Sequence, residues 1–150
     1  GLLMFSTFGP DTLKELRASF SDGGIHTQRF ADMHDLGDML VECGFADPVM
    51  DMEVLTMTYA SLDDLFRDLR QSGAACAMHA RRHGLMGRTA WQTMRAAYEK
   101  LAQQGRLPAT FEVVYGHAWK AQPKKTEDGR TIIRFESTPM PKTPMPKRTR

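Results

Sequence analysis

The residues best suited to chemistry include a group in one short stretch, HARRHGLMGR, near the middle of the chain. His79 and His83 have the i, i+4 spacing that zinc-binding helices use, but no Glu stands between them and no third ligand is evident. We therefore expect no metal site. The same stretch holds Arg81, Arg82 and Arg88, whose charge would steer an acidic protein partner to this part of the chain. The alternative is an ordinary solvated loop.

Two further sets of residues have the chemistry to bind a small acceptor molecule. Arg29, in HTQRF, carries a guanidinium group that can hold a carboxylate through two parallel hydrogen bonds, although most arginines in such loops are only solvated. Thr7, Phe8 and Gly9 follow the apolar run LLMF. If that run is a strand, these three lie at its carboxyl end, where ligands of open α/β sheets bind. The alternative is that Phe8 packs in the core and Gly9 turns the chain.

The opening run itself, GLLMFSTF, is nearly unbroken in apolar character and stops at Gly9-Pro10. Such a run is typical of a strand buried on both faces of a parallel sheet. A chain that starts inside a core also leads us to expect that a segment precedes Gly1. Asp11 or Thr12 is then expected to cap an amphipathic helix that runs to about Phe20.

The rest of the chain alternates between helical and extended patterns. We expect a helix from Asp32 or His34 to Cys43, a strand from Val49 to Tyr59 with an irregularity near Val54, and a helix capped by the Ser61/Asp64 pair. After a loop at 75–88, a helix from Thr89 closes at Gly105 and a strand covers Thr110 to Trp119. Asp128-Gly129 indicates a hairpin. The residues expected to face inward from the 32–43 helix are Met33, Leu36, Met39 and Leu40.

Composition limits the class of protein. A chain of 150 residues with 41% hydrophobic residues can form one domain of ordinary size. Its net charge of +2 divides unevenly, with 11 Lys/Arg against 15 Asp/Glu up to residue 119 and 9 against 3 after it. The basic end contains the repeat TPMPKTPMPK, which proline keeps extended; it lacks the aromatic residues of a nucleic-acid binder, so nucleic acid is not expected as a partner.

Location follows from what the sequence does not contain. No stretch approaches the roughly 20 apolar residues that a membrane helix requires, and no secretory signal is recognisable. We therefore expect a cytoplasmic protein with no membrane partner. Cys43 and Cys76 stand apart with no CxxC motif, which favours two reduced, packed thiols.

Four segments carry a resemblance to a known family: LLMFSTFGPDTLKELR, RFADMHDLGDMLVECGFADPVMDMEVLTMTY, DLRQSGA and RLPATFEVVYGHAW. In that order they resemble the C-terminal half of the malonyl-acyl-carrier-protein O-methyltransferases of biotin synthesis (BioC), which are class I S-adenosylmethionine-dependent methyltransferases. The resemblance covers roughly residues 1–135, so we expect a methyltransferase part at 1–135 and a flexible Pro/Lys-rich tail at 136–150.

The resemblance implies a particular α/β fold. Sheets of this class have the strand order 3-2-1-4-5-7-6. Residues 1–8 would be strand five, Val49 to Tyr59 strand six, and Thr110 to Trp119 the antiparallel strand seven inserted between them. Strand five would then have an open edge, which favours self-association of the chain.

The resemblance also implies an activity and its limits. The family methylates the free carboxylate of malonyl-acyl-carrier protein, and this half would supply the acceptor contacts, namely Thr7, Phe8, Gly9 and Arg29. The glycine-rich turn that holds S-adenosylmethionine is absent from these 150 residues, so we expect no cofactor binding and no activity from this chain alone. Two alternatives stay open: a non-catalytic interaction module, and a relative of the complex I assembly factor that hydroxylates arginine.

Overall fold

The computed structural model describes residues 1–74, 76–81 and 84–120. In this part of the chain the secondary structure alternates between strands and helices, in the order β1 (Leu2–Phe8), α1 (Lys14–Ser19), α2 (Met33–Glu42), β2 (Phe45–Tyr59), α3 (Leu62–Gln71), α4 (Arg88–Glu99) and β3 (Leu107–Lys120). The expected α/β class is confirmed.

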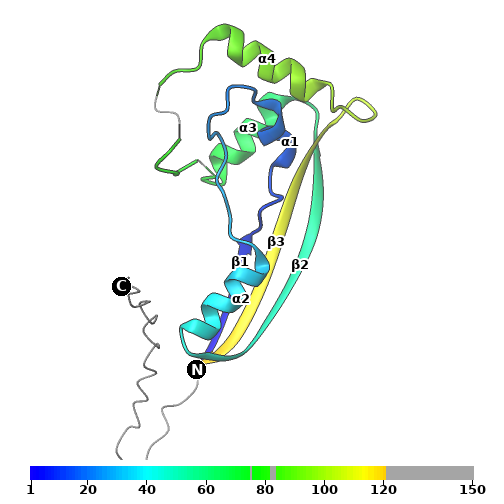
Figure 1. Ribbon diagram of the computed structural model, residues 1–150. Coiled ribbons are helices and arrows are strands. Elements are labelled where there is room, and N and C mark those ends of the chain that lie inside the picture. Colours follow the sequence, from blue (N-terminus) through cyan, green and yellow to red (C-terminus); the bar gives the residue numbers. More distant parts are fainter. Residues whose placement is uncertain (75, 82–83, 121–150) are drawn as a thin grey trace, which may run out of the picture.

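The described strands form one sheet with the order β1-β3-β2 (Figure 1). β3 pairs antiparallel with both neighbours, from Leu2↔Trp119 to Phe8↔Val113 on one side and out to Tyr59↔Leu107 on the other. β1 and β2 are therefore parallel to each other and separated by β3, the last of the described strands. The expectation that the final strand inserts between the other two is confirmed.

The two faces of the sheet carry different helices. Phe5, Gly116 and Met50 are register partners on one face, which α2 covers. The face has room for the Phe5 ring because position 116 is glycine: a Cβ there would lie 2.9 Å from the Met50 sulfur and closer still to Phe5. Gly37 of α2 lies over Met50, where a Cβ would be 3.7 Å from Met50 Cγ.

The main core lies on the opposite face, towards the end of the sheet where α1, α3 and α4 gather (Figure 1). Ser61 caps α3 by accepting a hydrogen bond from the backbone N–H of Asp64 at 3.2 Å, as its sequence predicts. This start orients one face of the helix towards the sheet, and each leucine buried there contributes about 1.5–3 kcal/mol. The core residues are Leu13, Leu16, Tyr59, Leu62, Leu65, Leu69, Met94, Tyr98, Leu107 and Ala109.

Three expectations about burial are wrong. β1 is not buried on both faces: Leu2 is 47% and Met4 72% exposed, because no described element covers that side of the strand. Met39 is 54% exposed, because α2 turns Met33, Leu36 and Leu40 to the sheet instead. Cys43 is an exposed free thiol, since it lies at the end of α2, whereas Cys76 is half-buried.

Three expectations about boundaries also need correction. The irregularity in β2 lies between Ala46 and Val49, not near Val54; Pro48 has no N–H to give to the ladder, so the pairing is interrupted there. α4 ends at Glu99, and Gly105, with φ of 75°, belongs to the tight turn that follows. The N-cap position of α1 is occupied by Leu13, not by Asp11 or Thr12, and the helix begins at Lys14.

The expected hairpin at Asp128-Gly129 and the tail at 136–150 lie outside the described residues. None of the helices in the described part of the chain has the length and apolar character that a membrane crossing requires.

Candidate functional site

A cavity of about 900 Å³ opens beside the carboxyl end of β1. Its walls come from the end of β1, from α1, from the carboxyl end of α3, from β3 and from two loop segments. These segments contribute residues 26–28 and 30, and residues 72–74, 76 and 77. Its size lies within the range of small-molecule sites, and its lining is mainly apolar, as such sites usually are. The principal apolar lining residues are Phe8, Leu16, Phe30, Phe66, Leu69 and Phe111.

Three aromatic rings from distant parts of the sequence form one wall of this pocket. Phe8 lies 5.6 Å from Phe30, edge to face, and 6.0 Å from Phe111, measured between ring centroids. Phe8 is the last residue of β1 and Phe111 lies in β3, so the sheet places these two rings side by side. The structure thus brings one predicted acceptor residue, Phe8, to a pocket.

The two loop segments at the rim are joined to each other. The side chain of Gln28 accepts a hydrogen bond from the backbone N–H of Ala77 at 3.2 Å, and its amide nitrogen donates to the sulfur of Met78 at 3.3 Å. Ile25 pairs with Arg81 in an isolated bridge. The predicted docking residue Arg81 is therefore held next to the segment that carries Arg29.

Two arginines in the pocket-lining segments have unengaged guanidinium groups. Arg70 lines the pocket from the end of α3, and Arg29 lies between Gln28 and Phe30, which both line it. Both side chains are exposed and, in the described part of the chain, form no ion pair or hydrogen bond. Other arginines are engaged: Arg67 binds Asp64 at 2.7 Å, for example. The sequence did not single out Arg70, because only tertiary packing brings α3 to this rim.

The other two residues predicted beside Phe8 are placed differently. Thr7 projects from the opposite face of β1, because successive side chains of a strand alternate. Gly9 is buried under the side chain of Glu112: a Cβ at Gly9 would lie 2.6 Å from Glu112 Oε1 and 2.8 Å from Cγ. Neither residue lines the pocket.

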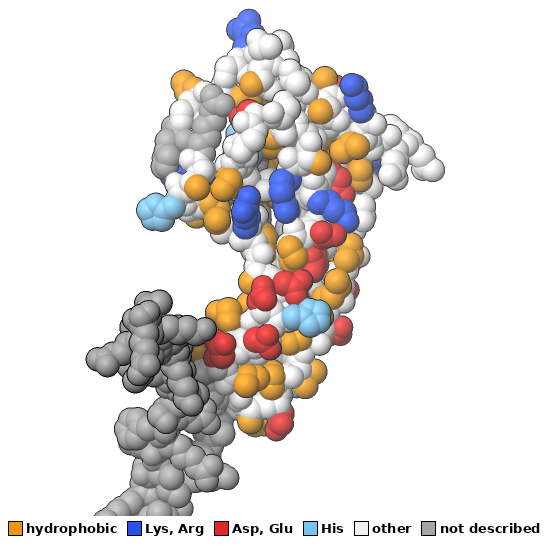
Figure 2. Space-filling model, viewed as in Figure 1, with side chains coloured by type: hydrophobic (Ala, Val, Ile, Leu, Met, Phe, Trp, Pro, Cys, Tyr) orange, Lys and Arg blue, Asp and Glu red, His pale blue; other side chains and the backbone are white. Residues whose placement is uncertain are grey.

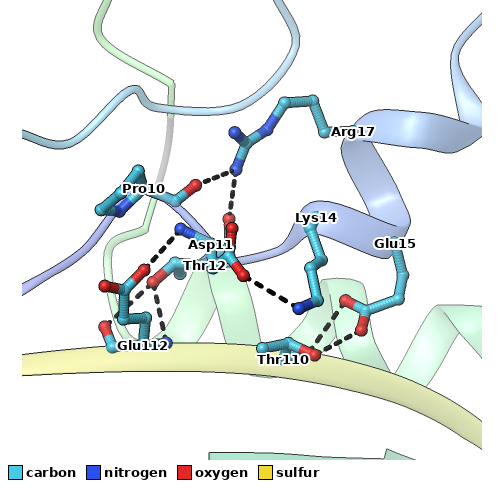
Figure 3. Close-up of polar contacts among 8 residues, drawn as sticks. All are labelled: Pro10, Asp11, Thr12, Lys14, Glu15, Arg17, Thr110 and Glu112. Atoms are coloured by element: carbon cyan, nitrogen blue, oxygen red, sulfur yellow. Dashed lines mark hydrogen bonds and ion pairs between the residues drawn. The ribbon is translucent and has the colours of Figure 1, made fainter. Parts of the chain in front are cut away.

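A set of polar contacts fixes the segment after β1 against β3 (Figure 3). The carboxylate of Glu112 accepts from the backbone N–H of Asp11 at 2.7 Å. The backbone of Glu112 accepts from Gly9 N–H at 2.9 Å and both donates to and accepts from the Thr12 hydroxyl at 3.1 Å. Leu13 N–H donates to the Thr110 carbonyl at 2.7 Å. We call Glu112 and the Gly9–Leu13 segment that it holds the Glu112 brace.

The brace explains why the predicted helix cap is wrong. The Thr12 hydroxyl is engaged with the backbone of Glu112 and the Asp11 carboxylate pairs with Lys14 at 2.9 Å, so neither side chain caps α1. Leu13 precedes the helix in a left-handed conformation with φ of 57°. α1 itself is tied to β3 from the far side, where the Glu15 carboxylate accepts from the backbone N–H of Thr110 at 3.0 Å and from its hydroxyl. The segment that follows Phe8 is therefore fixed to β3 by several hydrogen bonds.

Neither strand-to-helix turn of the described chain fits the nucleotide end of S-adenosylmethionine. After β1, the N–H groups of Gly9, Asp11 and Leu13 are bonded to β3, and the space above Gly9 is filled by a carboxylate. After β2, the turn is occupied by the Ser61 cap. A cofactor turn instead needs free backbone N–H groups and an open approach over glycine.

The remaining predicted residues lie away from the pocket or beyond the described residues. Arg82 and His83 fall outside them, and Arg88 is the exposed first residue of α4. Among the described residues no group of three or more His, Cys, Asp or Glu side chains could hold a metal ion. Figure 2 shows Lys and Arg side chains around the helical end of the molecule and Asp and Glu side chains over the other half of the sheet. An acidic partner would be attracted to the helical end.

Several curated proteins named malonyl-(acyl-carrier protein) O-methyltransferase are similar to this chain, three of them as follows. The protein of Laribacter hongkongensis is 58% identical over 140 residues, which are 90% of this chain and 47% of the relative. That of Gallionella capsiferriformans is 57% identical over 89% of the chain and 47% of the relative, and that of Nitrosospira multiformis is 60% identical over 83% and 41%. The chain thus spans about half the length of these relatives. No protein-family model matches it.

The sheet order, with one antiparallel strand between two parallel ones, is that of the C-terminal part of a methyltransferase fold. Together with these identities, it shows that the chain is similar to the C-terminal half of the malonyl-(acyl-carrier protein) O-methyltransferases.

Proposed function

We propose that this chain forms the acceptor-binding part of an S-adenosylmethionine-dependent methyltransferase that esterifies the free carboxylate of malonyl-acyl-carrier protein in biotin synthesis. The observation that carries the proposal is the identity of 57–60% to three proteins of that name over 83–90% of this chain. The apolar pocket at the carboxyl end of β1 agrees with it, because ligands of open α/β sheets bind at that end.

The chemistry asks this part of the enzyme only to bind and orient. A malonyl carboxylate is already ionised near neutral pH, so no base has to remove a proton before methyl transfer. Catalysis then depends on holding the acceptor in line with the methyl donor. Phe8 forms the wall of the pocket, Gly9 and Thr7 support it through the brace and the strand, and Arg29 binds the acceptor at the rim.

S-adenosylmethionine is supplied and held by a part of the active enzyme outside these residues. The turns of this chain do not fit it, so we expect calorimetry of this chain with S-adenosylmethionine to show no binding at micromolar concentration. Micromolar binding would contradict this division of labour. We further propose that the carrier protein docks through Arg81, Arg82 and Arg88, because such carriers are acidic.

A chimeric enzyme tests the proposal. This chain replaces the matching half of the Laribacter hongkongensis protein, and transfer of a labelled methyl group to malonyl-acyl-carrier protein is measured. We expect the chimera to be active and to lose activity when Arg29 is changed to Gln. Arg67→Gln, which removes a side chain paired with Asp64 on α3, should leave the activity unchanged. A folded chimera that binds S-adenosylmethionine but forms no methyl ester would refute the proposal in favour of a non-catalytic interaction module.

A further inference from the structure

We propose that Arg29 and Arg70 together form a carboxylate clamp at the mouth of the apolar pocket, and that this clamp selects the free acid of the acyl thioester over its methyl ester. The inference rests on the proposed function and deepens it, because it assigns a second residue to the acceptor site and gives the site a way to release its product.

Both arginines belong to segments that line the same pocket. Arg70 comes from the last turn of α3 and lines the pocket, and Arg29 comes from the loop that supplies Gln28 and Phe30 to the same pocket. The loop is fixed to the neighbouring segment through the Gln28–Ala77 hydrogen bond of 3.2 Å. The backbone of the loop that contains Arg29 is therefore fixed.

The charges near the pocket support an anion as that ligand. Neither guanidinium has an ion-pair partner in the described residues, and no Asp or Glu side chain lines the cavity. Two cations beside an apolar space are complementary to a ligand with one anionic end and a longer uncharged remainder. A thioester of malonate has this form, because one end of the three-carbon malonyl group is a carboxylate and the other end is joined through sulfur to a long uncharged arm.

Esterification changes this complementarity at a single atom. The carboxylate accepts two parallel hydrogen bonds from a guanidinium, and methylation of one oxygen removes both the negative charge and that geometry. The ester is then held by the apolar wall alone. Product therefore binds more weakly than substrate, and turnover does not require a separate releasing motion.

The two cysteines of the chain provide an assay with an internal control. Cys76 lines the pocket, whereas Cys43 is exposed at the end of α2. We would measure iodoacetamide labelling of each thiol by mass spectrometry on the whole 150-residue chain, with increasing malonyl-pantetheine. The expected result is slower labelling of Cys76 and unchanged labelling of Cys43.

Ligand and protein variants then isolate the clamp. Arg29→Gln and Arg70→Gln are each expected to raise the concentration of malonyl-pantetheine that protects Cys76 by about fivefold, the size of an exposed charge pair. For the wild-type chain, malonyl-pantetheine methyl ester should need a concentration about 25-fold higher than the acid, the product of the two effects. Arg67→Gln, three residues from Arg70 on the same helix, is the matched control and should have no effect. All the substituted side chains are exposed, and circular dichroism checks that each variant is folded.

Several results would overturn the clamp. These are equal protection by the acid and its methyl ester, unchanged protection in Arg70→Gln, or no protection of Cys76 by malonyl-pantetheine at any concentration. Protection that needs the phosphorylated arm and is lost in the arginine variants would assign the two side chains to phosphate instead. Normal Cys76 protection together with an inactive chimera would count against the proposed function and leave the clamp standing.

Discussion

Replacing Gly9 by Ala tests whether the Glu112 brace is the reason for glycine at this position. The added methyl group would overlap the Glu112 carboxylate, whose Oε1 lies 2.6 Å from the new Cβ, and would push it away from the Asp11 N–H that it accepts at 2.7 Å. Losing that charge-assisted hydrogen bond costs about 1–3 kcal/mol. Alanine restricts the unfolded chain and returns about 0.4–1 kcal/mol. We expect a net loss of about 1–2 kcal/mol of unfolding free energy.

The same change should have the opposite sign when the carboxylate is absent. In a Glu112→Ala background the methyl group has space and only the unfolded-state term remains, so Gly9→Ala should stabilise by about 0.4–1 kcal/mol. Urea unfolding followed by circular dichroism gives the unfolding free energies of the wild type, the two single variants and the double variant. The expected coupling energy of this double-mutant cycle is about 2 kcal/mol. Gly84→Ala, where nothing lies within 4 Å of the new Cβ, is the control. An equal cost of Gly9→Ala in both backgrounds would refute the reasoning.

Three further predictions concern stability and association. Tyr98, fully buried, donates to the Pro108 carbonyl at 2.8 Å, so Tyr98→Phe should cost about 1–2 kcal/mol in urea unfolding; a neutral effect would show that this bond adds nothing. The Ser61 hydroxyl, and then Arg67, lower the pKa of Asp64 below its ordinary 3.8. The contribution of Asp64 to the free energy of unfolding is therefore present above pH 3.8 and is lost as the pH falls through the lower folded-state pKa. The stability difference between the wild type and Asp64→Asn should shrink from about pH 6 to about pH 2. Met4→Lys places a charge on the exposed side of edge strand β1 and should reduce self-association in sedimentation; an unchanged mass average would exclude this strand from the contact.

Local signals in the sequence were sufficient for some elements and not for others. The α3 start is predicted correctly because Ser61 and Asp64 interact within one helical turn, and the buried Leu62, Leu65 and Leu69 follow from its periodicity. The α1 cap is predicted wrongly because the Thr12 hydroxyl is engaged by the backbone of Glu112, about a hundred residues away. No local pattern contains that information.

The candidate site divides in the same way. Phe8, which lines the pocket, could be predicted because the end of a strand is visible in the sequence. Arg29 is predicted from its residue type alone, because a guanidinium suits anion binding, and its role stays a prediction. Arg70 could not, since its relevance depends on where the end of α3 packs. Gly9 was expected near the acceptor, but the structure gives it a steric role: it leaves room for the Glu112 carboxylate.

The central position of β3 has a consequence for biosynthesis. β1 and β2 pair only with β3 among the described strands, and β3 spans residues 107–120. β1 therefore lacks its partner from this sheet while about a hundred residues are translated, and β2 while about fifty are. Contacts this distant in sequence form slowly, because a long loop must close first. The nascent chain thus exposes apolar segments until β3 emerges from the ribosome, and chaperones that bind such segments would act during this interval.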